Sequence, residues 1–187
     1  MIILFGLAGS GKSTQGQILA KKRGMVWLSV GQVLRDTGEF DEILKAGELV
    51  DDDKVIELMA AEIAKVRGEG KEVILDGFPR DEYQAKWVGE NIADDISDAV
   101  FLEVPKEELW ARIEVRGRAD DTREAIERRF DVVEQNIYAI LEILERKGVK
   151  IQQISGMGSI EEVTERLEGK IFGEAGKGGN TYPDFLA

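Results

Sequence analysis

The 187-residue sequence contains neither cysteine nor histidine. The absence of cysteine excludes disulfides, thiolate metal sites and thiol nucleophiles. The absence of histidine excludes imidazole acid–base catalysis and histidine-ligated metals. Any chemistry must therefore use carboxylates, lysine, arginine, hydroxyls, backbone amides or an ion held by oxygen. Reactions that need little proton transfer are favoured by these two absences.

Basic residues are scarce as well, with 25 lysines and arginines against 37 aspartates and glutamates, which gives a net charge of −12. This balance argues against a nucleic-acid partner and against an anionic membrane surface. No run approaches the roughly 20 apolar residues of a membrane-spanning helix, and the apolar run at the N-terminus is too short for a secretion signal. We therefore expect a cytoplasmic, monomeric protein of one domain, without a nucleic-acid or membrane partner.

Short apolar runs alternate with helical patterns along the chain. Strands are predicted at residues 2–5, 26–30, 73–75, 99–104 and 149–154. Helices are predicted at residues 12–23, 55–66, 83–92, from Pro105 onward, at 122–147 and at 160–172. Strands separated by helices predict an α/β fold with a parallel sheet covered on both faces. Residues 173–187 are expected to be a flexible tail, with docking of Tyr182, Phe185 and Leu186 on the body as the alternative.

The strongest motif runs from Gly6 to Ser13 and reads GLAGSGKS, between a predicted strand and a predicted helix. It fits the pattern of a phosphate-binding loop, in which glycines let backbone N–H groups point inward and the helix N-terminus adds further unpaired amides. Lys12 can bridge terminal phosphates, and the hydroxyl of Ser13 can bind magnesium. A glycine-rich turn with an exposed lysine is the alternative, and the strand–loop–helix context argues against it.

Two further signals point to a nucleotide with its metal. Asp76 ends the predicted strand at residues 73–75, where many P-loop enzymes hold the waters of magnesium. Six arginines gather in an otherwise acidic chain: Arg112, Arg116, Arg118, Arg123, Arg128 and Arg129. The first three can converge on a polyphosphate, because guanidinium groups match phosphate oxygens in pairs. Arg123 and Arg128 are better explained by a solvated helix face.

Five segments occur in the order and spacing of one known family. They are GLAGSGKSTQ at residues 6–15, LSVGQVLR at 28–35, AGELVDD at 46–52, DGFPR at 76–80 with Gln84, and RGRADD at 116–121 with Arg129. In these segments the chain resembles the adenylate kinase family of nucleoside monophosphate kinases over about residues 1–165. The phosphate loop alone indicates only a superfamily, whereas DGFPR followed by RADD is specific.

The resemblance implies a three-layer P-loop NTPase fold around a central five-stranded parallel sheet. Residues 1–30, 61–111 and 122–172 would form the core. Residues 31–60 would be a small helical flap that binds the monophosphate, and residues 112–121 a short lid, because only Gly117 separates Arg116 from Arg118.

The resemblance further implies reversible, Mg²⁺-dependent transfer of the γ-phosphoryl group of ATP to AMP, which yields two molecules of ADP. Such a transfer needs positioning and charge cancellation rather than a strong base, which suits a chain without histidine. A kinase for UMP or CMP is the alternative, and a nucleotide-binding regulatory module without transfer is a second one. A kinase for another small acceptor is disfavoured by the DGFPR and RADD segments.

The resemblance also assigns residue roles. The catalytic group would be Lys12, Arg80, Arg116, Arg118 and Arg129. ATP would be bound by Gly9, Ser10, Gly11, Lys12, Ser13, Thr14, Arg112, Arg116 and Gly158. AMP would be bound by Val30, Arg35, Val50, Gly77, Arg80, Gln84, Arg118 and Arg129. Magnesium would be held by Ser13 and, through water, by Asp76, while Asp120 and Asp121 would make closing contacts of the lid.

Four positions bear on acceptor choice and on the metal. The amide of Gln84 can donate and accept, which matches the adenine edge and favours AMP, with a solvated helix residue as the alternative. Val30 replaces a threonine common in AMP-specific members. Ser13 replaces the usual glycine and offers a direct magnesium ligand, whereas Gln32 replaces an aspartate near the metal.

Overall fold

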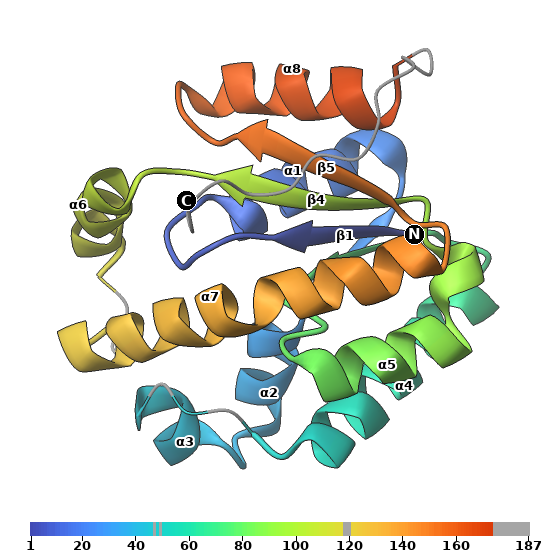
Figure 1. Cartoon of the computed structure of the whole chain (residues 1–187), viewed down its shortest axis with the longest axis horizontal. Helices are drawn as coiled ribbons and strands as arrows, with labels where there is room; N and C mark the ends of the chain where they lie inside the picture. Colours follow the sequence, from blue (N-terminus) through green and yellow to red (C-terminus); the bar gives the residue numbers. More distant parts are fainter. Residues whose placement is uncertain (47, 49, 118–120, 174–187) are drawn as a thin grey trace.

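The fold was analysed in a computed structural model that describes residues 1–46, 48, 50–117 and 121–173. Its centre is an all-parallel sheet of five strands in the order β2-β3-β1-β4-β5 (Figure 1). The strands are β1 (Ile2–Phe5), β2 (Val26–Ser29), β3 (Val73–Asp76), β4 (Asp98–Glu103) and β5 (Lys150–Ser155). The predicted α/β fold with a central five-stranded parallel sheet is therefore confirmed.

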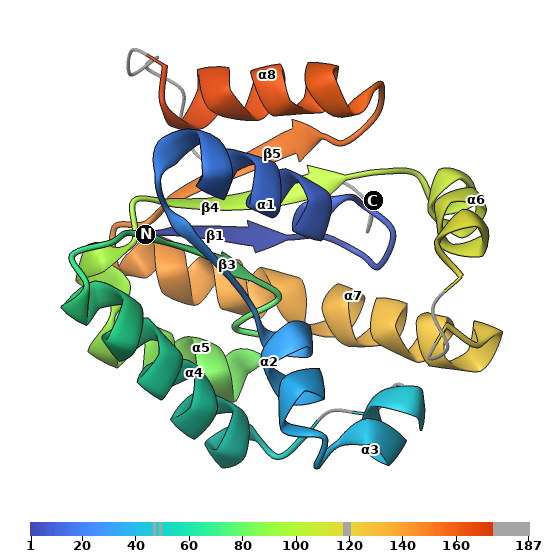
Figure 2. The same cartoon turned by 180° about the vertical axis from the view of Figure 1, so that it is seen from behind.

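Helices cover both faces of the sheet, as Figures 1 and 2 show. Their bounds are α1 (Lys12–Arg23), α2 (Val30–Thr37), α3 (Asp41–Ala46), α4 (Asp52–Gly68), α5 (Glu82–Asn91), α6 (Lys106–Arg116), α7 (Arg123–Arg146) and α8 (Ile160–Ile171), with a 3-10 turn η1 at Ala93–Asp95. The helices α1 and α8 lie on one face, and α4, α5 and α7 lie on the other.

The side chains of β1 alternate between the two apolar clusters of the core. Ile2 and Leu4 belong to one apolar cluster with residues of α1 and α8, whereas Ile3 and Phe5 belong to a second cluster with residues of α4, α5 and α7. Successive side chains of a strand point to opposite faces, so a strand covered on both sides must be apolar throughout. This is why the short run at residues 2–5 could be predicted as a buried strand.

Local signals set the helix ends close to their predicted positions. The hydroxyl of Thr122 accepts a hydrogen bond from Ala125 N and starts α7, and Ser159 forms a capping box with Glu162 at the start of α8. Gly117, with φ of 58°, ends α6. These caps matter for function because α6, α7 and α8 each bring residues to one cavity.

The flap expected to bind the monophosphate packs against the core in this structure. Residues 31–60 hold most of α2, all of α3 and the first half of α4, and Leu34, Leu44 and Met59 belong to the larger apolar cluster. Of the expected lid, residues 118–120 lie outside the described residues, and so does the tail beyond Gly173.

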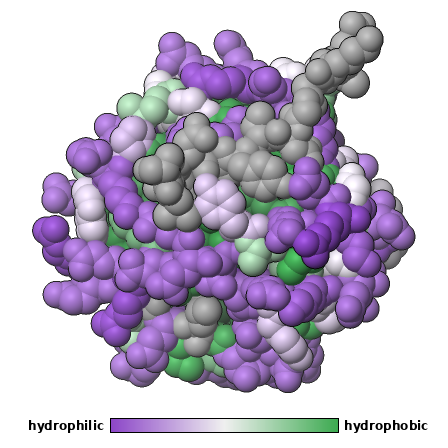
Figure 3. Space-filling view, viewed as in Figure 1, coloured by the Kyte–Doolittle hydropathy of each residue, from purple (hydrophilic) through white to green (hydrophobic). Residues whose placement is uncertain are grey.

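The surface agrees with the acidic composition. The face in Figure 3 is mainly hydrophilic, with hydrophobic residues in small separate areas. Among the described residues, no helix combines the length and the apolar character that crossing a bilayer requires.

Candidate active site

A cavity of about 850 Å³ lies at the carboxyl ends of β1 and β3, next to the loops that follow them. Ligands of open parallel sheets bind at this edge, where the strand order reverses. The predicted site residues that line the cavity are Gly9, Ser10, Gly11, Lys12, Ser13, Thr14, Arg35, Asp76, Gly77, Arg80, Arg112, Arg129 and Gly158. The fold thus brings together residues from both halves of the chain.

The phosphate loop connects β1 to α1 in the geometry that its glycines require. Gly9 and Gly11 have φ of 84° and 96°, in the left-handed region that favours glycine. A Cβ atom on Gly9 would also lie 3.0 Å from the carbonyl oxygen of Leu109, so α6 packs directly on the loop. Gly11 caps α1 without a side-chain hydrogen bond, and the first turn of α1 has no acidic residue. The N-terminus of α1 therefore retains its positive end for an anion.

Lys12 is folded over this loop. Its Nζ donates hydrogen bonds to the carbonyl oxygens of Gly6 at 2.6 Å and Leu7 at 2.9 Å. The ammonium group thus lies beside the turn that the phosphates would enter. A nucleotide phosphate can replace these two carbonyl acceptors, because it offers charged oxygens to the same donor.

Ser13 and Asp76 meet at the base of the cavity. The Ser13 hydroxyl donates to Asp76 Oδ2 at 2.7 Å, and the indole Nε1 of Trp27 donates to the same oxygen at 3.3 Å. A hydroxyl and a carboxylate are ligands that suit Mg²⁺, which normally keeps several waters and substrate oxygens. Within the described ranges no cluster of three or more carboxylates could cage a metal alone. The donor set therefore fits an ion that arrives with a polyphosphate.

Three arginines that line the same cavity come from separate elements: Arg35 from α2, Arg80 from the turn after β3, and Arg129 from α7. Arg80 Nε donates to the Gly77 carbonyl at 2.9 Å. The pKa of Arg80 is lowered to about 10, mainly by desolvation and also by the positive charges of Arg129 and Arg35, while the charge of Asp76 opposes the shift. This part of the cavity is therefore positively charged beyond what its own carboxylate balances, which suits an anionic ligand.

Arg35 donates to Gln32 Oε1 at 3.4 Å, and Arg129 has both a neutral and a charged acceptor. A Cβ atom on Gly31 would lie 3.4 Å from Arg35 Nη1 and 3.7 Å from Arg80 Nη2, so both guanidinium groups approach one point of the backbone. Arg129 donates to the Leu44 carbonyl at 2.8 Å and to Asp121 Oδ1 at 3.3 Å. Arg129 thereby joins α7 to α3.

Comparison with known proteins gives the family. The adenylate kinase family model matches residues 4–149. An adenylate kinase of Synechococcus is 32% identical over 182 residues, which cover 91% of this chain and 97% of that protein. An adenylate kinase of Thermus thermophilus is 34% identical over 185 residues, covering 91% and 96%, and one of Micrococcus luteus is 34% identical over 181 residues, covering 89% and 87%. The chain belongs to the adenylate kinase family. It is a phosphotransferase that acts on nucleoside monophosphates.

Three of the residues that the family resemblance assigns to the acceptor do not line the cavity. Val30, Val50 and Gln84 are buried. The amide of Gln84 is engaged at both ends, because Nε2 donates to Asp52 Oδ1 at 2.8 Å and Oε1 accepts from Arg80 N at 2.9 Å. The alternative of a solvated Gln84 is therefore wrong, and its reading of the base stays a prediction that requires an exchange of these hydrogen bonds.

The remaining assigned residues belong to the donor side and the lid. Arg112 donates to Glu108 Oε1 at 2.8 Å and to the Gly156 carbonyl at 3.1 Å, which links α6 to the loop before α8. Arg116 ends α6, while Arg118 and Asp120 lie outside the described residues. Their roles stay predictions.

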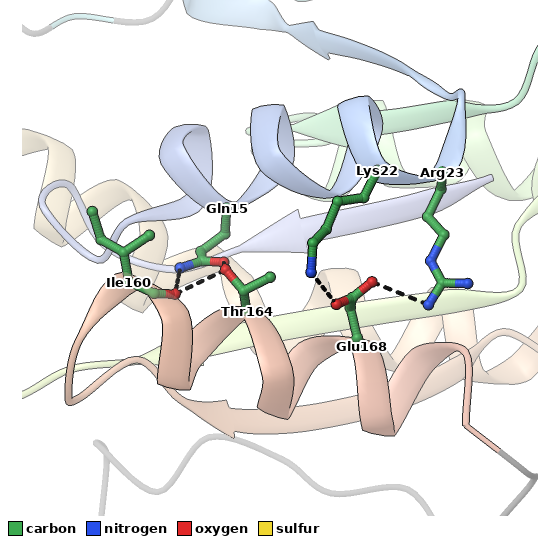
Figure 4. Close-up of polar contacts among 6 residues, drawn as sticks. All are labelled: Gln15, Lys22, Arg23, Ile160, Thr164 and Glu168. Carbon is green, nitrogen blue, oxygen red and sulfur yellow. Dashed lines mark hydrogen bonds and ion pairs between the residues drawn. The ribbon is translucent and has the colours of Figure 1, made fainter.

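Sequence reasoning missed one polar network behind the phosphate loop (Figure 4). Gln15 is buried in α1, where Nε2 donates to the Ile160 carbonyl at 3.0 Å and Oε1 accepts from the Thr164 hydroxyl at 2.7 Å. Farther along the same two helices, Glu168 pairs with Lys22 and Arg23. Ile160 itself lines the cavity, so the network joins the loop helix of the adenylate kinase core to the donor side. Gln15 follows the phosphate motif, but nothing in its spacing indicates α8 as partner.

Proposed function

We propose that this member of the adenylate kinase family transfers the γ-phosphoryl group of ATP to AMP, reversibly and with Mg²⁺, to give two molecules of ADP. The observation that carries the proposal is one cavity that is lined both by a phosphate loop and by Arg35, Arg80 and Arg129. A site of this kind accommodates two phosphorylated ligands whose phosphates meet in the middle. We propose a monomer as the active unit.

The donor would occupy the side of the phosphate loop. Backbone amides of residues 9–14 and Lys12 would bind its β- and γ-phosphates, and Arg112 and Gly158 would contact the rest of the nucleotide. Ser13 and Asp76 would hold the metal, which when bound neutralises charge on the phosphates. The arrangement follows from the free N-terminus of α1 and from the hydrogen bond between Ser13 and Asp76.

The acceptor would occupy the arginine side, under the flap of residues 31–60. Arg35 and Arg80 would clamp its phosphate next to Gly77. Val30 and Val50 would contact the base only after the flap rearranges, because both are buried here. One acceptor oxygen attacks the γ-phosphorus, the bond to the β-γ bridging oxygen breaks, and ADP leaves. The attacking oxygen is already anionic, so no side chain has to remove a proton.

Arg80, Arg129, Arg116 and Arg118 would stabilise the charge on the transferred group. The short lid of residues 112–121 would exclude water when both nucleotides are present, which prevents hydrolysis of ATP. The same closure would bring the lid arginines to the phosphates only in the ternary complex.

A UMP or CMP kinase is the second candidate. The observation that favours it is the amide of Gln84, which is bonded to Asp52 and to the backbone of Arg80 rather than directed into the cavity. Val30 adds to this case, because it lacks the hydroxyl of the threonine common in AMP-specific members.

A panel of acceptors tests the proposal. The protein is incubated with ATP and Mg²⁺ together with AMP, UMP, CMP, GMP or no acceptor, and diphosphate products are separated by chromatography. We expect a diphosphate product only when AMP is the acceptor, and no product when Mg²⁺ is chelated. ATP binding without transfer to any acceptor would contradict the enzymatic proposal, and products confined to UMP and CMP would select the second candidate.

A pair of neighbouring arginines supplies a matched control. Arg129→Ala should lose most of the transfer rate, because Arg129 lines the cavity. Arg128→Ala should retain it, because Arg128 is exposed and donates to the Glu124 carbonyl of its own helix at 3.4 Å. Equal rates in the two variants would contradict the role of Arg129.

A further inference from the structure

Trp27 has an unusual place beside the proposed metal site. It is the second residue of β2 and lines the cavity. Its indole Nε1 donates at 3.3 Å to Asp76 Oδ2, the oxygen that also accepts from the Ser13 hydroxyl at 2.7 Å. The sequence motifs do not include Trp27, and the proposed mechanism assigns it no part.

Packing fixes the orientation of this indole. Gly16 of α1 lies directly over the ring, since a Cβ atom at Gly16 would be 2.6 Å from Trp27 Cδ1 and 2.8 Å from Nε1. Any larger residue at position 16 would displace the indole edge that reaches Asp76. The glycine in the helix and the tryptophan in the strand therefore form one local arrangement, which keeps Nε1 directed at the carboxylate.

The chemistry of the indole N–H limits this contact to one kind of hydrogen bond. Its N–H only donates and does not ionise, so it holds Asp76 as an acceptor and supports the charged carboxylate. Groups that donate a hydrogen bond to a metal-binding carboxylate without touching the metal fix the orientation of that carboxylate. Their loss typically weakens metal binding about 10- to 100-fold. We propose that Trp27 is a positioning residue that orients Asp76 for the Mg²⁺ of the nucleotide complex. This inference rests on the proposed Mg²⁺-dependent function.

Two substitutions separate the N–H group from the bulk of the ring. Trp27→Phe keeps an aromatic ring against Gly16 and removes the donor. Trp27→His removes the second ring but retains a donor, because Nε2 of imidazole stands two bonds from Cγ, as Nε1 of indole does. A purely structural role predicts that the smaller histidine is at least as harmful as phenylalanine, whereas a positioning role predicts the reverse.

The measurement is the effect of Mg²⁺ on nucleotide affinity, without any turnover. Calorimetry gives the Kd of a non-transferable ATP analogue with Mg²⁺ and with EDTA, and the ratio of the two values reports the coupling between metal and nucleotide. For Trp27→Phe we expect the ratio to fall about tenfold, with an unchanged Kd in EDTA. Trp27→His should keep most of the wild-type ratio. The control Trp87→Phe, at a tryptophan that packs on Phe78, should keep all of it.

The outcomes distinguish this inference from the function on which it rests. A wild-type ratio in Trp27→Phe, or an equal loss in Trp27→Phe and Trp27→His, overturns the positioning role and leaves the kinase proposal intact. A wild-type protein without any Mg²⁺ effect overturns both. Circular dichroism of each variant confirms that the comparison is made between folded proteins.

Discussion

Replacing Arg80 with methionine should make the nucleotide-free protein more stable while it abolishes phosphoryl transfer. The Arg80 side chain is half-buried, and its environment lowers its pKa to about 10. Desolvation is the main cause, and the charges of Arg129 and Arg35 act in the same direction. The folded, ligand-free protein therefore disfavours the charged form that the reaction needs.

The size of this effect follows from the shift. The lowered pKa of about 10 corresponds to about 3 kcal/mol against the charged form, at about 1.36 kcal/mol per pH unit. Because the folded-state pKa of this base is lowered, the penalty is fully present below pH 10 and is relieved as the pH rises above that value. Methionine removes this penalty but also the hydrogen bond to Gly77, which contributes about 1 kcal/mol. The expected net gain is about 1–2 kcal/mol.

Urea unfolding at pH 7 without nucleotide measures the gain, and an ADP assay measures the loss of transfer. Arg128→Met is the matched control: it removes an exposed arginine from α7, and its unfolding free energy should stay within about 0.5 kcal/mol of wild type. If Arg80→Met lowers the unfolding free energy by about 1 kcal/mol or more, the charge of Arg80 is compensated in the free protein. The argument from an unbalanced cationic site would then be refuted.

The remaining predictions concern other contacts. Lys12→Ala should lower the transfer rate about 10²- to 10³-fold in the ADP assay, with an unchanged far-UV circular dichroism spectrum. Gln15→Ala should lower the unfolding free energy in urea by about 1–3 kcal/mol, because it breaks a buried network, whereas Glu168→Gln removes exposed ion pairs and should leave the urea midpoint nearly unchanged. Desolvation and the neighbouring Asp52 raise the pKa of Asp81, which disfavours its charged form above pH 3.8. Asp81→Asn should therefore raise the melting temperature at pH 7, and the gain should vanish below pH 3.8.

The elements of the fold could be predicted because their signals are local. The apolar run Ile2–Phe5, the proline before α6 and the threonine before α7 act within a few residues of themselves. The order of the strands in the sheet could not be predicted from periodicity, because it depends on which buried faces meet. The strand expected at residues 26–30 is one residue shorter for a similar reason, since Val30 begins α2 and packs in the larger apolar cluster.

The candidate site also has one part that local sequence signals predict and another part that they do not. The phosphate loop is contiguous, so a motif was enough to predict that Gly9–Thr14 line one cavity. The contact of Arg129 with the Leu44 carbonyl spans 85 positions, and that of Gln84 with Asp52 spans 32. Both depend on how the flap packs on the core, which no spacing encodes. The resemblance to a family supplied Arg129 and Gln84 as candidates, but it gave no indication that their polar groups pair within the chain.

The absence of histidine and the number of arginines at the site both suit a reaction that needs lasting positive charge rather than a base. A monophosphate acceptor brings its own anionic nucleophile, so a titrating base adds little, whereas the transferred group needs positive charge that persists at every physiological pH. In its proposed role Arg80 would meet this need even with its pKa lowered to about 10, and an imidazole would not, because it loses its charge near neutrality. In a chain with a net charge of −12, such a site is a local exception in an acidic protein. Its field therefore favours anionic nucleotides at the cavity over the rest of the surface.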